Sequence, residues 1–243
     1  MSSLSSVPVE IAVQDAVGAR SALAAGAQRL ELCQALEVGG LTPSLGLIQA
    51  TCEAVDPAAV FVLVRPRPGG FVYSDEEVDV VTADIHACVS RGVGGVVVGA
   101  LDAGGAVDTK VVQRWRDATG DATLVFHRAI DASRDPLESL ALLVDAGVNR
   151  VLTSGGALRA IDGVETLAAL SAQANARVEV MAGGGVSPTD IPALVAAGVD
   201  AVHLSARHRV GEDAPAGPGG GTSTGHDATD VALVRQAVAF ASR

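Results

Sequence analysis

Short runs of apolar residues alternate with longer amphipathic stretches along the whole chain. The runs consist mostly of continuous Val, Leu and Ile rather than strictly alternating apolar and polar residues. Continuous runs of this kind are typical of parallel strands that are covered on both faces. The pattern predicts eight strands, at Val9–Val13, Arg29–Cys33, Val60–Arg65, Gly95–Gly99, Ala122–Arg128, Arg150–Ser154, Arg177–Ala182 and Ala201–Ser205.

Helix signals lie between these runs. Capping residues at Ser74, Asp135 and Ser187 predict helix starts, two of them followed directly by proline. An Ala-Gly pair precedes three of the strands, where glycine suits a left-handed helix C-cap, at Gly26, Gly147 and Gly198. Repeated strand–helix units predict an α/β fold, a single-domain (β/α)₈ TIM barrel over residues 1–243. An open, doubly wound parallel sheet is the alternative.

One segment interrupts the pattern. Residues Gly211–Asp227 read GEDAPAGPGGGTSTGHD, and they precede a helix predicted near Asp230–Ala241. The segment has too few apolar residues to offset the entropy lost on ordering. It is predicted to be a flexible loop, either without a role of its own or acting as a lid over the barrel mouth.

The amino-acid composition and net charge limit what the protein is expected to bind. The length of 243 residues suits one barrel, and only 2% of the residues are aromatic, so Val, Leu, Ile and Ala must fill the core. The net charge of −11 argues against nucleic acid and membrane surfaces as partners. The N-terminus has no signal-peptide pattern, and no apolar run is long enough to span a membrane. A cytoplasmic protein is expected.

Candidate catalytic residues lie at the C-terminal ends of the predicted strands, where barrel active sites form. Alternation along a strand places Glu31 and Cys33 on one face of the second strand. The other candidates for acid–base work are Arg65, His127 and His203, with Arg128 and Asp131 just beyond the fifth strand. The alternative is that these groups form a fully satisfied polar plug inside the barrel.

An anion site is predicted at the ends of the seventh and eighth strands. The glycines after the seventh strand expose backbone N–H groups, and the next helix would offer its positive end. The predicted anion-binding residues are Gly183, Gly184, Gly185, Ser205 and Arg207. The glycines could instead form only a tight turn.

Soft metal ligands are few. The chain has three cysteines, and it lacks Cys-x-x-Cys and His-x-x-x-His spacing. Cu(I) favours thiolate and thioether ligands, and Cys33 and Cys52 are the pair to consider. Buried cysteines that act as small hydrophobic residues are the alternative.

Six stretches stand out along the chain, in the order ELCQALEVGGLTPSLG, RPRPGGFVYSDEE, FHRAID, RVLTSGG, MAGGGV and VHLSAR. In sequence and in order they resemble the CutC family, usually called copper homeostasis proteins. The resemblance implies a TIM-type barrel, a cytoplasmic location and a homo-oligomer, a dimer or tetramer. It also implies copper handling, with Cu(I) at Cys33 and Cys52. The Gly/Pro-rich segment departs from the family pattern.

The resemblance and the residues favour different functions. The resemblance favours cytoplasmic Cu(I) binding or handling. The polar, arginine-bearing mouth favours an enzyme, a lyase or isomerase, that acts on a small phosphorylated or carboxylated metabolite. A non-catalytic module that binds such an anion is a third class. The loop Phe71–Ser74 is placed to cover the mouth.

Overall fold

A computed structural model describes residues 6–211 and 225–242. Its main sheet is a closed barrel of eight parallel strands in sequential order. The strands are β1 (Val9–Val13), β2 (Arg29–Leu32), β3 (Val60–Leu63), β4 (Gly95–Val98), β5 (Thr123–Phe126), β6 (Arg150–Thr153), β7 (Glu179–Gly183) and β8 (Ala201–Leu204). The predicted barrel is confirmed, and the open sheet is excluded.

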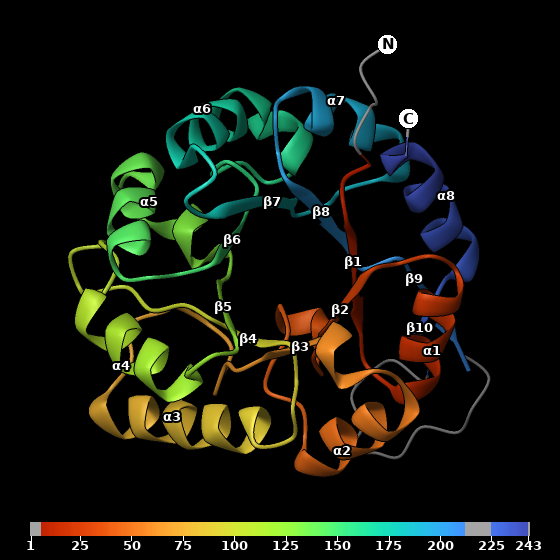
Figure 1. Ribbon diagram of the computed structural model, residues 1–243, viewed down its shortest axis with the longest axis horizontal. Coiled ribbons are helices and arrows are strands. Elements are labelled where there is room, and N and C mark those ends of the chain that lie inside the picture. Colours follow the sequence, from red (N-terminus) through yellow and green to blue (C-terminus); the bar gives the residue numbers. More distant parts are fainter. Residues whose placement is uncertain (1–5, 212–224, 243) are drawn as a thin grey trace.

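Helices surround the barrel as an outer ring (Figure 1). They are α1 (Ala16–Ala24), α2 (Leu45–Ala54), α3 (Asp75–Val89), α4 (Thr109–Thr119), α5 (Pro136–Asp145), α6 (Val164–Ala174), α7 (Ile191–Ala196) and α8 (Val231–Ala241). Ser74 and Asp135 cap α3 and α5 as predicted, and Ser74 forms a capping box with Glu77. Ser187 instead precedes a 3₁₀ turn ahead of α7. None of the described helices is long and apolar enough to cross a membrane.

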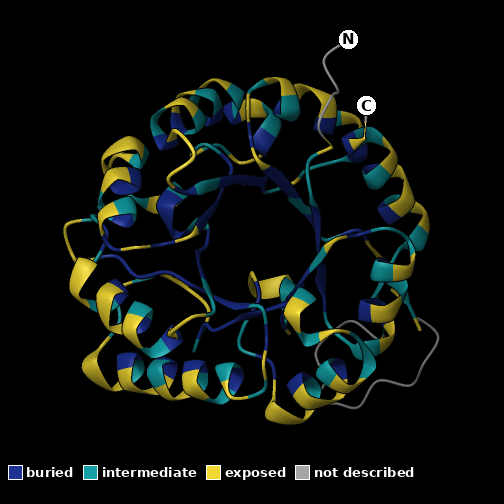
Figure 2. Ribbon diagram, viewed as in Figure 1, coloured by how far each residue is buried: buried dark blue, intermediate teal, exposed yellow. Residues whose placement is uncertain are grey.

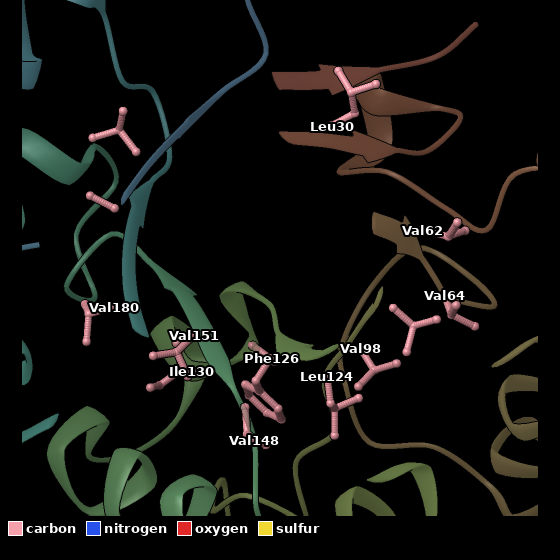
Figure 3. Close-up of a cluster of buried hydrophobic side chains, with 14 of the residues drawn as sticks. Leu30, Val62, Val64, Val98, Leu124, Phe126, Ile130, Val148, Val151 and Val180 are labelled. Atoms are coloured by element: carbon pink, nitrogen blue, oxygen red, sulfur yellow. The ribbon is translucent and has the colours of Figure 1, made fainter. Parts of the chain in front are cut away.

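The main core lies between the strands and the helices. Each helix turns a buried side to the barrel and an exposed side outward (Figure 2). Figure 3 shows ten labelled members of the large cluster that fills this layer, among them Leu30, Val62 and Phe126. Two smaller clusters alternate with it along the strands, one with Cys33, Phe61, Leu63, Val97 and Val125 and one with Leu152, Met181 and Ala201. Because strand side chains alternate, these smaller clusters fill the barrel interior.

Most of the strands end one or two residues before the predicted boundary. Arg65, His127 and Ser205 thus lie just past the last paired residue of their strands. His127 caps a 3₁₀ turn at Arg128–Ala132, and its ring accepts the N–H of Ala129. The chain turns outward at these points, which places polar residues on the rim of the barrel.

A two-stranded antiparallel hairpin, β9 (Arg207–Val210) with β10 (His226–Thr229), follows β8. The predicted loop at Gly211–Asp227 was too long at its C-terminal end, because His226 and Asp227 are paired in β10. Residues 212–224 lie outside the described part of the chain, so the predictions for them stay predictions.

Candidate functional site

A cavity of about 250 Å³ opens at the C-terminal ends of the strands. The structure places five predicted site residues around it, Glu31, Arg65, His127, His203 and Ser205, together with Gly184 and Gly185. The fold brings these residues together around one cavity, and their roles stay predictions. A larger groove of about 890 Å³ lies between α1 and the hairpin, and none of the predicted site residues lines it.

Glu31 and His203 line the cavity and form a cluster with Glu10, which is fully buried and does not line it. One ligand atom from each lies within 4.8 Å of the others. His203 Nδ1 lies 3.0 Å from Glu10 Oε1. Burial alone would raise the pKa of Glu10, but His203, Arg150 and Arg29 hold it below its ordinary value, so Glu10 is a carboxylate and Nδ1 is the donor. Glu10 therefore orients the imidazole, as a carboxylate does in a catalytic triad.

The pKa values of Glu31 and His203 are both raised above their ordinary values. Burial raises the pKa of Glu31. Burial alone would lower the pKa of His203, but the charges of Glu31 and Glu10 outweigh it and raise the value. Both groups line the cavity. A carboxyl group that holds its proton more strongly than usual beside an imidazole is suited to acid–base catalysis.

Below this cluster a charged network closes the barrel. Glu10 Oε2 lies 3.4 Å from Arg150 and 3.8 Å from Arg29, and Arg29 forms a bidentate pair with Glu179 at 2.6 and 3.0 Å. Arg150 also lies over the ring of Phe61. Sequence analysis did not name Arg29, Arg150 and Glu179 as members of a charged layer. The signal was present as charges at the first positions of β2, β6 and β7.

His127 is buried and neutral. Burial and the nearby Arg65 lower its pKa to about 3. Its Nδ1 accepts the Ala129 N–H at 3.1 Å, so the proton resides on Nε2. That nitrogen is buried and has no hydrogen-bond partner among the described residues. Gly99 makes room for the ring, since a Cβ there would lie 2.4 Å from two ring atoms.

Arg65 is mainly a clamp between two loops. Its Nη1 donates to the carbonyls of Val38 and Gly40, and its Nη2 donates to Gly69 at 2.8 Å. Its Nε is buried without a partner among the described residues. The ring of Phe71 lies over both Arg65, at 5.2 Å, and His127, at 5.0 Å between centroids. Phe71 therefore covers this side of the cavity, as the position of its loop suggested.

Arg128 is more available to a ligand than Arg65. Its Nε donates to Asp131 at 2.8 Å and its Nη2 to Ser154 at 3.0 Å, while its Nη1 donates no hydrogen bond within the described residues. The guanidinium lies against Gly184, where a Cβ would come within 2.8 Å of its carbon. Asp131 also accepts from Thr153, Ser154 and Gly156, so it fixes both Arg128 and the loop after β6.

Backbone amides complete the rim. The N–H groups of Gly184, Gly185 and Val186 have no acceptor within residues 6–211 and 225–242, and all three residues line the cavity. Positive φ angles of 110° at Gly184 and 59° at Gly185 require glycine there. The helix that follows has only six residues, so the expected helix-dipole contribution is not available.

Two predicted anion-binding residues do not line the cavity. Gly183 lies within β7, where a Cβ would meet Leu152 at 2.4 Å and His203 at 3.2 Å, so this glycine makes room for its neighbours. Arg207 lies in β9 and its guanidinium pairs with Asp227.

Cys33 and Cys52, the predicted Cu(I) ligands, lie on opposite sides of the strand layer. Cys33 is in a barrel-interior cluster, and its thiol faces the carbonyl of Val13. Cys52 is on α2 and packs against the outer core. Burial raises the pKa of both thiols, strongly for Cys33. The described structure does not bring them into one site.

Comparison with known proteins fits this picture of a (β/α)₈ barrel with a small-ligand cavity in its mouth. The CutC family model matches residues 7–208, so the chain belongs to the CutC family. A family protein CutC of Xylella fastidiosa is 43% identical over 98% of this chain and 90% of that protein. One from Xanthomonas campestris pv. campestris is 42% identical over 95% of this chain and 97% of that protein.

A solved structure gives the same result. It was proposed to be a copper homeostasis protein CutC from Streptococcus agalactiae, and it superimposes with a TM-score of 0.75 at 32% identity. The match covers 81% of this chain and 97% of that one. The resemblance inferred from the sequence motifs is confirmed.

Proposed function

We propose that this protein is an acid–base enzyme, a lyase or isomerase, that acts on a small phosphorylated or carboxylated metabolite bound in the barrel mouth. The observation that carries the proposal is the Glu10–His203–Glu31 cluster at a cavity with unpaired amides and arginines on its rim. A module that only binds its ligand would not require two titratable groups with perturbed pKa values in one cavity.

The charge around the cavity favours an anionic ligand. Arg65 and Arg128 line it, and the Glu10 carboxylate is already offset by His203, Arg150 and Arg29. Glu31, the remaining acidic group, has a raised pKa and is the easier carboxyl to neutralise. Three amides and the Arg128 Nη1 offer donors to phosphate or carboxylate oxygens.

The chemistry that we assign to Glu31 and His203 is proton transfer. Glu10 holds His203 through Nδ1, so the other ring nitrogen is the one that exchanges protons. Between them, Glu31 and His203 supply one acid and one base. The base takes a proton from a substrate carbon, and the acid returns a proton to a neighbouring atom. Partial exclusion of water by Phe71 would strengthen these interactions.

Carbon–hydrogen exchange tests this function. The protein is incubated in D₂O with a panel of small keto and aldo phosphates and oxo-acids, and exchange is followed by ¹H NMR. Wild type is expected to catalyse exchange in at least one compound, and Glu31→Gln and His203→Asn are expected to lose it by 100-fold or more. Exchange that survives both substitutions would remove these residues from the reaction.

Copper handling is a second candidate, supported by the proposed identity of the Streptococcus agalactiae relative. Glu10, Glu31 and His203 offer carboxylate and imidazole donors, which suit Cu(II) better than Cu(I). Anaerobic Cu(I) titration of the wild type, Cys33→Ser and Cys52→Ser tests the thiol site. Unchanged affinity in both variants would remove the two cysteines. A cytoplasmic location and a homo-oligomer are part of the same proposal.

A further inference from the structure

Two buried hydrogen-bond donors at the cavity lack partners among the described residues, His127 Nε2 and Arg65 Nε. Both residues line the cavity, and both are covered by the same ring, that of Phe71. Buried donors without partners are rare because each costs free energy to desolvate. Two of them under one aromatic side chain indicate a position that a ligand atom fills.

The rest of the structure fixes both donors in place. The His127 ring is held by the Ala129 amide on one side and by the absence of a side chain at Gly99 on the other. Arg65 is anchored through its other nitrogens to the carbonyls of Val38, Gly40 and Gly69. These anchors use three of the five N–H bonds of Arg65 and leave its Nε–H, and they leave the Nε2–H of His127, so two donors are held in place at one cavity.

We propose that His127 Nε2–H and Arg65 Nε–H form an oxygen subsite, uncovered when Phe71 moves aside, that binds the carbonyl oxygen of the substrate. This inference rests on the proposed function, and it narrows the substrate class to carbonyl compounds that carry a phosphate or carboxylate. A neutral imidazole suits a carbonyl oxygen, on which negative charge grows as an adjacent carbon loses its proton. The anionic group lies separately, against Arg128 and the amides of Gly184 and Gly185.

Matched ligands test the subsite. Hydroxyacetone phosphate and propyl phosphate share size and charge, and they differ in the carbonyl oxygen. Their dissociation constants are measured by calorimetry, with inorganic phosphate as the reference for the anion site. We expect the ketone to bind about tenfold more tightly to the wild type. His127→Leu should reduce that preference to less than about twofold while phosphate still binds.

Gly99→Ala provides a second variant that keeps the imidazole and displaces it, and the same loss of preference is expected. ¹⁵N NMR of the histidines supplies a readout independent of folding losses. His127 should be the neutral Nε2–H tautomer between pH 5 and 9, and its Nε2 proton should shift downfield with the ketone but not with propyl phosphate.

The outcomes separate the two proposals. If phosphate binds but the wild type shows equal affinity for the two ligands, the subsite is wrong and the anion site stands. If the preference persists in His127→Leu, or if NMR finds the Nδ1–H tautomer, His127 is not the donor. If phosphate does not bind to the wild type, the proposed function fails and the subsite fails with it.

Discussion

Acidification should destabilise the fold through His127. The ordinary pKa of histidine is 6.5, and burial beside Arg65 lowers that of His127 to about 3, with Asp131 opposing the shift only weakly. Between pH 6.5 and about 3, His127 is protonated in the unfolded chain and neutral in the folded protein. Stability therefore rises with pH through this window and falls as the pH drops from 6.5 towards 3.

The magnitude follows from the size of the shift. Each pKa unit corresponds to about 1.4 kcal/mol, so lowering the pH to 4.5 should remove roughly 2.5–3 kcal/mol of the free energy of unfolding. Because the His127 side chain is almost wholly buried, solvent screens this contribution little. His203 opposes it, since its raised pKa stabilises the fold at low pH and that contribution is lost as the pH rises.

The assay is urea unfolding at pH 7.5 and pH 4.5 for the wild type and His127→Gln. Glutamine keeps an acceptor for the Ala129 amide but does not titrate. The wild type should lose about 2.5–3 kcal/mol more than the variant between the two pH values, with His203 common to both. Equal losses would mean that the His127 pKa is near its ordinary value, and the account of a buried, neutral donor would be refuted.

The other predictions concern the loops of the mouth. Asp131→Ala should lower the free energy of unfolding by roughly 3 kcal/mol or more, measured in urea, because its carboxylate accepts hydrogen bonds from Arg128, Thr153 and Ser154. A loss below about 1 kcal/mol would contradict that role. Arg207→Ala should leave thermal protection by phosphate unchanged, because this side chain pairs with Asp227 in the hairpin; weaker protection would return it to the anion site.

The sequence predicted the barrel because its strands are buried on both faces. Seven of the eight strands begin within one residue of the predicted start, since burial on the outer face requires continuous apolar residues there. Most strands were predicted to end one or two residues further along the chain than they do. Hydrophobicity continues past the last strand residue, at residues such as Cys33, which packs into the interior and lies outside β2 although its N–H still donates to Val13.

The site was predictable where strand alternation fixes direction, as for Glu31 and His203. Arg65, His127 and Ser205 lie just beyond the strand ends and line the cavity as well, but the contacts that their side chains make there were not predictable. The direction of Arg128 depends on the 3₁₀ turn and on Asp131, neither of which follows from periodicity. Arg207 lies in a hairpin whose strands are polar, so no apolar pattern predicted the pairing of those strands.

Thermal unfolding with and without phosphate tests the central claim most directly. At 100 times the dissociation constant, phosphate should add about 2.7 kcal/mol and raise the Tm of the wild type by roughly 5–10 °C. Arg128→Gln should lose most of this shift relative to its own Tm. The control Arg114→Gln, at a surface ion pair with Asp79 on α3, should keep it. No shift in the wild type, or an equal shift in Arg128→Gln, would contradict an anion site in the barrel mouth.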